Sequence, residues 1–316
     1  MEQLRFDGRS AIVTGAGRGV GRAHALLLAS RGAKVVVADI GGSLAGTGSD
    51  AGPAHEVVAE IEAAGGQAVA CHASVAEETG AASIVQTALD AFGSVDIVVN
   101  NAGIADPDWF EDISSERIRR MIDVHYLGSV YVAQAAWRHM AAAGYGRIVN
   151  TCSEAMLGMV PKAVPYGAAK GAVLSFTREA ALEGARLGIR VNAVAPRADT
   201  RLSGPAIMAK TYDVAEEMFA DGSIMAQFKP ELVSPAMAYL AHESCSMSGE
   251  VLISGGGQVM RLGLFVNEGI TSEDLTPEVV ALSVDRLMDM TGASESKVET
   301  LAGEAVSAAR DEAGTA

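Results

Sequence analysis

Cysteines are few in this chain and long apolar runs are absent, and each of these facts excludes a class of protein. The three cysteines, Cys71, Cys152 and Cys245, lack the spacing of metal ligands or of a disulfide framework, so we expect small core residues, a reducing compartment and no metal. No run of about eighteen apolar residues is present that would form a transmembrane helix. Neither end carries a recognised targeting signal, and we therefore expect a cytoplasmic protein.

Positive charge is also in short supply. The chain has 24 Lys and Arg against 39 Asp and Glu, a net charge of -15. This balance argues against nucleic acid or a membrane surface as a partner, because phosphate backbones and anionic lipids attract basic surfaces. The chain does contain 49% hydrophobic residues over 316 positions, enough to bury one large core.

Short β-branched runs alternate with helical stretches as far as about residue 263. The runs are residues 11–13, 35–38, 68–71, 97–99, 148–150, 190–194 and 251–253. Because they are apolar throughout rather than alternating with polar residues, they are typical of parallel strands covered on both faces. With right-handed crossovers, the pattern predicts an α/β fold over residues 1–263, a doubly wound parallel sheet of about seven strands of the Rossmann type.

Residues 264–316 break this pattern and predict an acidic helical C-terminal extension. They carry eleven acidic and three basic side chains, a net charge of -8. Two apolar stripes at helical spacing predict two helices; the first is Val280, Val284, Leu287 and Met288, and the second is Val298, Leu301, Ala302, Ala305 and Ala309. Two interpretations stay open: a solvated helical cap, or a subunit contact that closes an active site.

A glycine-rich turn joins the first predicted strand to a helix predicted over residues 22–31. Glycines at such a turn let the backbone approach a pyrophosphate, which lies at the N-terminus of the helix. The residues that we expect at a dinucleotide from this turn are Gly15, Arg18, Gly19, Val20 and Gly21.

Asp39 ends the second predicted strand, eighteen residues after Gly21. A carboxylate there accepts hydrogen bonds from the adenosine ribose and repels a 2′-phosphate, which favours NAD over NADP. Arg18 points weakly the other way, because a guanidinium in the turn can reach a 2′-phosphate, although a surface arginine is the commoner explanation.

Three side chains in the middle of the chain suit proton transfer without a metal. Tyr166 and Lys170 are four residues apart and share one face of a helix, so the ammonium can stabilise a phenolate and lower its pKa towards physiological pH. Ser153, thirteen residues upstream, can hydrogen-bond a carbonyl oxygen. The three predict an acid/base site for oxidising an alcohol or reducing a ketone.

These motifs resemble those of the short-chain dehydrogenase/reductase family over about residues 5–260. The resemblance rests on the glycine turn, the Asn100-Asn101-Ala102-Gly103 segment, Ser153 and the Tyr166-Gly167-Ala168-Ala169-Lys170 segment. It implies that Tyr166 is the general acid/base, that Lys170 lowers its pKa and holds the nicotinamide ribose, and that Ser153 polarises the carbonyl. It also implies a homodimer or homotetramer. The other residues that it places at the cofactor are Ala73, Ser74, Asn101, Ala102, Gly103, Pro196, Ala198 and Thr200.

The chain departs from the family at two positions. His125 stands where the family usually has an Asn that helps to relay protons, so it is either a relay member or an ordinary packed histidine. Ala73 replaces a common Asp that contacts adenine, which leaves adenine recognition to other groups such as the Ser74 hydroxyl or the backbone.

Further stretches resemble the hydroxyacyl-CoA dehydrogenase unit of peroxisomal D-specific multifunctional enzymes, as far as about residue 290. They include residues 38–42 with a following insertion, 136–140, 228–231, 242–245 and 275–280. This resemblance implies that a (3R)-hydroxyacyl-CoA is oxidised to the 3-ketoacyl-CoA with NAD. Two alternatives stay open: a dehydrogenase of a sterol, terpenoid or xenobiotic alcohol, and, more remotely, a non-catalytic NAD-binding regulator.

The region around the substrate is apolar in two places. Residues 197–228 form a long connection with Met208, Met218, Phe219, Met225 and Phe228, which predicts a flexible apolar lid. Met156, Leu157, Met159 and Val160 predict an apolar wall for an acyl chain or a sterol ring. Lys162, Arg197 and Arg201 are candidates for binding CoA phosphates, although loop cations are more often solvated.

Overall fold

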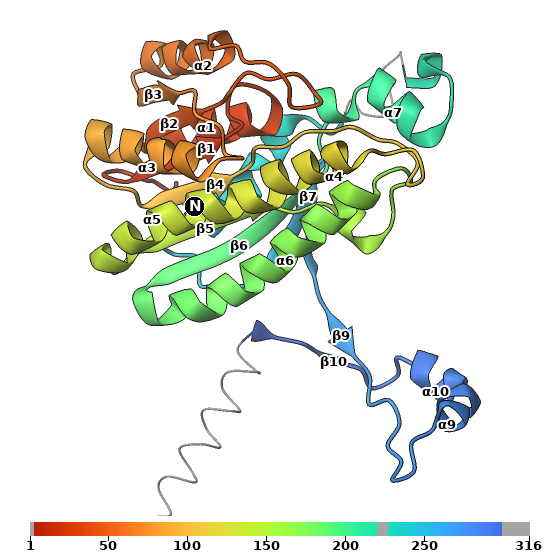
Figure 1. Cartoon of the computed structure of the whole chain (residues 1–316). Coiled ribbons are helices and arrows are strands. Elements are labelled where there is room, and N and C mark those ends of the chain that lie inside the picture. Colours follow the sequence, from red (N-terminus) through yellow and green to blue (C-terminus); the bar gives the residue numbers. More distant parts are fainter. Residues whose placement is uncertain (1–2, 220–226, 299–316) are drawn as a thin grey trace, which may run out of the picture. The chain divides into compact units, whose positions relative to one another are not determined.

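The computed structural model describes residues 3–219 and 227–298, and its main element is an eight-stranded sheet (Figure 1). The strands are β1 (Ser10–Thr14), β2 (Lys34–Ala38), β3 (Gln67–Cys71), β4 (Ile97–Asn100), β5 (Gly146–Thr151), β6 (Ile189–Pro196), β7 (Val251–Gly255) and β8 (Gln258–Leu262). The first seven are parallel and coincide with the seven predicted runs. β8 is an additional edge strand beside β7 that the sequence pattern did not indicate.

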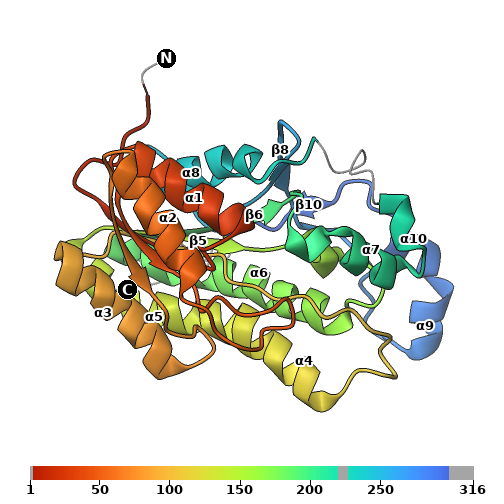
Figure 2. The same ribbon diagram turned by 90° about the horizontal axis from the view of Figure 1, so that it is seen from above.

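Helices cover both faces of the sheet, as Figure 2 shows from above. The main helices are α1 (Gly19–Ser30), α2 (Gly52–Ala63), α3 (Glu78–Phe92), α4 (Ser115–Ile122), α5 (Gly128–Ala143), α6 (Val164–Gly184), α7 (Pro205–Tyr212) and α8 (Ser234–Ala241). α1, α2 and α8 pack in one hydrophobic core, and α3, α5 and α6 pack in the other. The helix predicted over residues 22–31 therefore begins three residues earlier, inside the glycine turn.

The two cores explain why the strands are apolar throughout. Along β1, Val13 faces the core of α1 and α8, whereas its neighbour Ile12 faces the core of α3 and α5, and both are fully buried. Successive side chains of a strand point to opposite faces, so a strand with a helical layer on each side needs an apolar residue at every position. Cys71, Cys152 and Cys245 are all buried and free, as predicted.

The strand order places the cleft of the fold between β1 and β4. The order is β3-β2-β1-β4-β5-β6-β7-β8, so the chain runs outwards in one direction to β3 and then crosses back to β4. The loops after β1 and β4 therefore leave the sheet towards opposite faces, which opens a crevice at the carboxyl ends of these strands.

A π-helical turn interrupts the long helix formed by α4 and α5. Residues Asp123–Leu127 form this turn, and His125 lies within it. Single π turns inside α-helices widen the backbone locally and recur at functional sites. The turn therefore marks His125 as a residue to examine with the cleft.

The chain divides into two compact units, Met1–Arg261 and Leu262–Ala316. The described part of the second unit contains a short two-stranded sheet, β9 (Phe265–Val266) with β10 (Ser294–Glu295), and two short helices, α9 (Pro277–Leu282) and α10 (Val284–Met288). The first apolar stripe was predicted to be one helix, which is wrong, because Ser283 ends α9 and α10 begins after it. The second stripe, apart from Val298, lies outside the described residues.

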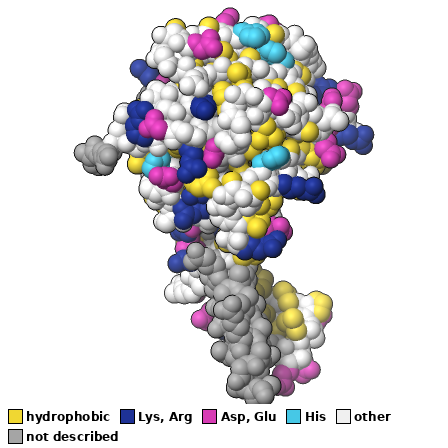
Figure 3. Space-filling view, turned by 90° about the vertical axis from the view of Figure 1, so that its left-hand side faces the viewer, with side chains coloured by type: hydrophobic (Ala, Val, Ile, Leu, Met, Phe, Trp, Pro, Cys, Tyr) yellow, Lys and Arg dark blue, Asp and Glu magenta, His cyan; other side chains and the backbone are white. Residues whose placement is uncertain are grey.

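Charge is mixed rather than segregated on the face drawn in Figure 3, where Lys and Arg are interspersed with Asp and Glu. This face offers no broad basic surface of the kind that binds phosphate backbones. Within residues 3–219 and 227–298, no helix has the length and apolar character needed to cross a membrane.

The core makes a stability prediction with a matched control. Leu240 on α8 is 1% exposed, whereas Leu232, eight residues earlier, is 40% exposed. Leu240→Ala leaves a cavity in the packed core and should lower the free energy of unfolding by about 2–5 kcal/mol. Leu232→Ala should lower it by less than about 1 kcal/mol. Urea unfolding measures both, and equal losses would contradict the burial assigned to α8.

Candidate active site

A cavity of about 390 Å³ occupies the crevice at the carboxyl ends of the strands. Every residue predicted to contact the cofactor lines it: Gly15, Arg18, Gly19, Val20, Gly21, Asp39, Ala73, Ser74, Asn101, Ala102, Gly103, Tyr166, Lys170, Pro196, Ala198 and Thr200. His125 lines it too, whereas Ser153 is not among its lining residues. The structure therefore brings segments from six loops and helices to one hollow.

The glycine turn after β1 is packed too closely to hold side chains. A Cβ on Gly21 would lie 2.2 Å from the Gly15 carbonyl oxygen, and one on Gly17 would lie 2.9 Å from Asp39 Oδ2. The absence of Cβ atoms lets the turn fold against its neighbours and leaves the N-terminus of α1 facing the cavity. A glycine turn at the N-terminus of a helix is the kind of cradle that receives a dinucleotide pyrophosphate.

Asp39 is held at the end of β2 by two backbone groups. Its Oδ2 accepts a hydrogen bond from Gly17 N at 2.7 Å, and its Oδ1 accepts one from Gly41 N at 2.6 Å. Each carboxylate oxygen has a second lone pair that stays available to a hydroxyl. The side chain is thus fixed in place and can receive the two hydroxyls of a ribose.

Asn101 lines the cavity, as predicted, and its side chain also holds two loops together. Its amide Nδ2 donates to Thr14 O at 2.9 Å and to Gly15 O at 3.2 Å, so both amide hydrogens are used inside the protein. Thr14 Oγ1 in turn accepts from Asn101 N and Ala102 N, at 3.0 and 3.1 Å. Asn101 lines the cavity, but its side-chain amide ties the loop after β4 to the loop after β1.

Ser153 and Tyr166 are coupled at the end of β5 and the start of α6. Ser153 caps the short 3-10 helix of residues Glu154–Leu157, and its Oγ accepts from Ala155 N at 3.2 Å. Burial raises the pKa of Tyr166 above its ordinary value, while a side-chain hydrogen bond with Ser153 acts in the opposite direction. The serine hydroxyl is therefore the described group that favours the phenolate.

Lys170 lies beside Tyr166, and its hydrogen bond goes to the end of β5. Its Nζ donates to Thr151 O at 2.6 Å and lies 5.8 Å from the centre of the Tyr166 ring. Lys170 is 3% exposed, and burial lowers its pKa to about 8. At pH 7 a lysine with this pKa is still mostly protonated, so an ammonium lies beside the phenol ring.

His125 lies directly against Tyr166. The two rings meet edge to face, with centroids 5.1 Å apart. His125 is 1% exposed, and burial together with the charge of Lys170 lowers its pKa well below the ordinary value, so it is neutral. Nε2 pairs with the backbone of Ile104, and Nδ1 is buried without a partner among the described residues.

A second, apolar cavity of about 120 Å³ adjoins the first, and Tyr166, Ile104 and Leu202 line both. Its other apolar walls are Ala105, Pro107, Met121, Val160, Ala163, Pro165 and Ile207. Of the predicted wall, Val160 alone lines it; Leu157 and Met159 are 44% and 63% exposed. Of the predicted lid, residues 205–212 form α7, Met218 is 61% exposed, and Met225 lies outside the described residues.

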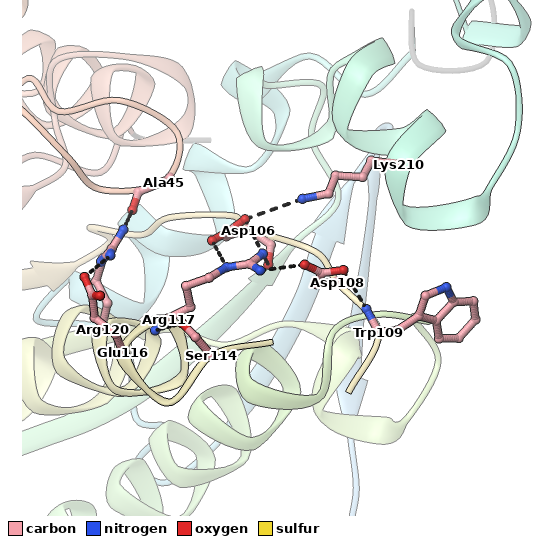
Figure 4. Close-up of polar contacts among 9 residues, drawn as sticks. All are labelled: Ala45, Asp106, Asp108, Trp109, Ser114, Glu116, Arg117, Arg120 and Lys210. Atoms are coloured by element: carbon pink, nitrogen blue, oxygen red, sulfur yellow. Dashed lines mark hydrogen bonds and ion pairs between the residues drawn. The ribbon is translucent and has the colours of Figure 1, made fainter. Parts of the chain in front are cut away.

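An ion-pair network borders the apolar cavity (Figure 4). Arg117 of α4 binds both oxygens of Asp106 at 2.6 Å and one oxygen of Asp108 at 2.5 Å, and Lys210 of α7 lies 3.6 Å from Asp106. The guanidinium of Arg117 lowers the pKa of both aspartates. The network fixes the loop after β4 and links it to α7.

Two of the three cations proposed for CoA phosphates are paired with carboxylates of the protein. Arg197 binds both oxygens of Glu154 at 2.7 Å, and Lys162 pairs with Asp213 and donates to Lys210 O at 2.8 Å. Neither is a free phosphate ligand. Arg201 differs, because its Nη1 donates to the Gly42 carbonyl oxygen at 2.9 Å and it lines the larger cavity.

The geometry agrees with a comparison of the whole sequence against known families. Residues 9–203 match the short chain dehydrogenase family. The chain belongs to this family. It is therefore an oxidoreductase, and the family expected from its motifs is confirmed.

Three known proteins illustrate the similarity. A short-chain type dehydrogenase/reductase of Mycobacterium tuberculosis is 42% identical over 287 residues, which is 90% of this chain and 96% of that protein. Peroxisomal multifunctional enzyme type 2 of Mus musculus is 39% identical over 298 residues, 92% of this chain but only 38% of the mouse protein. The structure of 7α-hydroxysteroid dehydrogenase complexed with NADH and 7-oxo glycochenodeoxycholic acid has a TM-score of 0.69 at 30% identity, covering 81% of this chain and 98% of that one.

Some residues of the cavities escaped sequence reasoning. Arg120, Ile40, Gly42 and Ser43 line the larger cavity, and Met121 and Ile207 line the apolar one. The insertion after β2 was the available signal for the first group, since Arg120 Nη1 donates to Ala45 O within it at 3.1 Å. Nothing in the local sequence distinguishes Met121 or Ile207 from ordinary core residues.

The coupling of Ser153 to Tyr166 predicts a shift in pH dependence. Alcohol oxidation needs the deprotonated phenol, so the rate should rise with pH through the pKa of Tyr166. Ser153→Ala removes the hydrogen bond that lowers this pKa, so the midpoint of the profile should move to higher pH while the maximum falls about 100-fold or more. Cys245→Ala, a substitution at a buried residue outside the lining of both cavities, serves as control. A Ser153→Ala midpoint equal to or below that of the parent would contradict the coupling.

Proposed function

We propose that the protein is an NAD-dependent dehydrogenase of secondary alcohols, with a (3R)-hydroxyacyl-CoA as its foremost substrate. The observation that carries the proposal is the position of Tyr166, which lines both the large cleft and the apolar cavity. A substrate in the apolar cavity can exchange a proton with the phenol of Tyr166, while its reacting carbon faces a nicotinamide in the larger cavity.

The protein residues divide the work as follows. Ser153 orients the substrate oxygen, and Tyr166 takes up the hydroxyl proton during oxidation or returns it during reduction. Lys170, held by Thr151 O, positions the sugar next to the reacting ring of the cofactor. Bound NAD would supply the hydride acceptor. His125, neutral and against Tyr166, keeps water from one edge of the phenol, and its Nδ1 is buried without a partner among the described residues.

Asp39 supports NAD rather than NADP. Its carboxylate is fixed by Gly17 N and Gly41 N, so it cannot easily turn away from a 2′-phosphate. The solved relative with NADH is consistent with this choice. Arg18, the residue that favoured NADP, lies 4.0 Å from Asp50 and is therefore partly neutralised.

The acyl-CoA substrate is supported by the similarity to peroxisomal multifunctional enzyme type 2. This chain matches 38% of the length of that protein. A second candidate, an alicyclic or sterol alcohol, is favoured by a specific observation. The charged side chains that line the apolar cavity, Asp106 and Lys162, both have partners within the protein, so the cavity favours a neutral apolar body. The solved hydroxysteroid dehydrogenase also acts on such a ring. The regulator is the remote alternative, since it has no need of Tyr166 and Lys170.

The compartment, the oligomeric state and the role of the C-terminal extension are predictions. We expect a cytoplasmic homodimer or homotetramer, in which residues 264–316 either form a solvated cap or close a partner's active site. Light scattering during size-exclusion chromatography measures the oligomer directly.

Tyr166→Phe tests the assignment of the base. Removal of the hydroxyl should lower turnover about 100-fold or more and leave NADH affinity within about twofold, because the ring still packs against His125. Steady-state rates and NADH fluorescence titration measure the two quantities. A variant that keeps a tenth of the parent rate would disprove the role of Tyr166.

Lys170→Ala tests the double role of the lysine. Both turnover and NADH affinity should fall, because the variant lacks the group that positions the cofactor sugar and supports the phenol. Lys34→Ala, at the first residue of β2 and outside the lining of both cavities, is the control for general effects of charge. Unchanged NADH affinity in Lys170→Ala would remove the lysine from the cofactor site.

A substrate panel separates the two candidate substrates. The purified protein is given NAD with a 3-hydroxyacyl-CoA, the matching free acid and a hydroxysteroid, and the best pair is repeated with NADP. We expect the CoA thioester and NAD to give the highest kcat/KM. Turnover of the free alcohols alone would replace the acyl-CoA with the alicyclic alcohol as substrate.

A further inference from the structure

Four Arg or Lys side chains line the larger cavity, and their partners differ. Arg120 is paired with Glu116 at 2.8 Å, Lys170 is bound to Thr151 O, and Arg18 lies 4.0 Å from Asp50. Arg201 has no carboxylate within ion-pair distance among the described residues, and its hydrogen bond to Gly42 O uses one of five N–H donors. Among the described arginines that line this cavity, Arg201 is thus the one without a carboxylate partner, in a chain of net charge -15.

The base of Arg201 is held rigidly beside the glycine turn. Thr200 caps the short 3-10 helix of residues Arg201–Ser203, with Leu202 N donating to Thr200 Oγ1 at 3.2 Å and Thr200 N donating to Ser203 Oγ at 3.0 Å. A Cβ on Gly19 would lie 3.3 Å from the Thr200 methyl group, so this segment packs directly on the N-terminus of α1. Arg201 therefore starts next to the turn that receives the pyrophosphate.

The side chain of Arg201 then crosses the cavity to its other wall. Its Nη1 reaches Gly42 O in the loop after β2, 159 residues earlier in the chain. The charges of Arg18 and Asp39 both act on its guanidinium, which places it among the groups that surround the adenosine end of the cleft. The segment after β6 and the loop after β2 are thus joined by one cation.

We propose that Arg201 is a phosphate-binding residue of the dinucleotide site, closing the cleft opposite the glycine turn. The inference rests on the proposed NAD dependence. The glycine turn offers backbone N–H groups from one side, and Arg201 offers a charged planar donor from the other. Its bond to Gly42 holds the guanidinium across the opening before a ligand arrives, so less side-chain freedom is lost on binding. The same chemistry would serve a CoA phosphate, and the experiment distinguishes the two sources.

Direct binding measurements test the proposal without turnover. NADH is titrated by its fluorescence, and ADP, adenosine and CoA are measured by displacement of NADH. Arg201→Gln should weaken NADH and ADP about tenfold or more, because a charge-assisted hydrogen bond to phosphate is lost, and it should leave adenosine within about twofold. Arg201→Lys should lie in between, because an ammonium keeps the charge without the planar pair of donors. Arg22→Gln, which breaks an exposed ion pair with Glu60 on the outer side of α1, is the control and should bind all ligands as the parent does.

Each other outcome overturns the proposal in a distinct way. Equal weakening of ADP and adenosine in Arg201→Gln would mean a disturbed cleft rather than a lost phosphate contact. Weakening of CoA alone would assign the arginine to the substrate. If the parent protein binds NADH and Arg201→Gln binds it equally well, the role of Arg201 is overturned and the proposed function stays intact. Parent protein that binds neither NADH nor ADP would overturn both.

Discussion

The hydrogen bonds between the ends of β1 and β4 are the constraint on which the site depends. At this point the strand order reverses, and two loops that leave the sheet in opposite directions have to be kept close together. Thr14 and Asn101 do this with four bonds, two from backbone N–H groups to the threonine hydroxyl and two from the asparagine amide to the backbone. The glycine turn folds around this junction, since a Cβ on Gly15 would lie 2.7 Å from Ala102 Cα. The glycine turn and the loop after β4 are therefore held together as one unit.

Burial sets the chemistry at the other end of the cleft. It raises the pKa of Tyr166, lowers that of Lys170 to about 8 and keeps His125 neutral, so each of the three is driven towards its uncharged form. The hydrogen bond from Ser153 is the described influence that works the other way on Tyr166. For the protein as a whole, the lowered pKa of Lys170 means that the folded state loses its proton first. Its burial therefore costs stability below about pH 8, and that cost disappears as pH rises from about 8 past the unfolded value of about 10.4.

The fold and the cleft could be predicted from the sequence because both depend on local sequence patterns. Seven apolar runs became seven parallel strands, and the motif residues from Gly15 to Thr200 came together in one cavity, since the carboxyl ends of parallel strands share an edge. The strand β8 was missed because its residues, with Gln258 and Arg261 exposed, do not form an apolar run. The apolar wall was misplaced because Met121 and Ile207 reach the cavity only through the tertiary packing of α4 and α7. Other features depend on distances in the folded chain that residue spacing does not report. They are the hydrogen bonds of the Asn101 amide, the partners of Lys162 and Arg197, and the orientation of Lys170.

A crystal structure of the protein with bound NADH would test the central claim most directly. The account predicts the adenosine ribose at Asp39, the pyrophosphate between the N-terminus of α1 and Arg201, and the nicotinamide beside Tyr166 with its reactive carbon facing the apolar cavity. A dinucleotide bound with its nicotinamide away from Tyr166, or density for NADH outside the cleft, would contradict the assignment of this cleft as the site of hydride transfer.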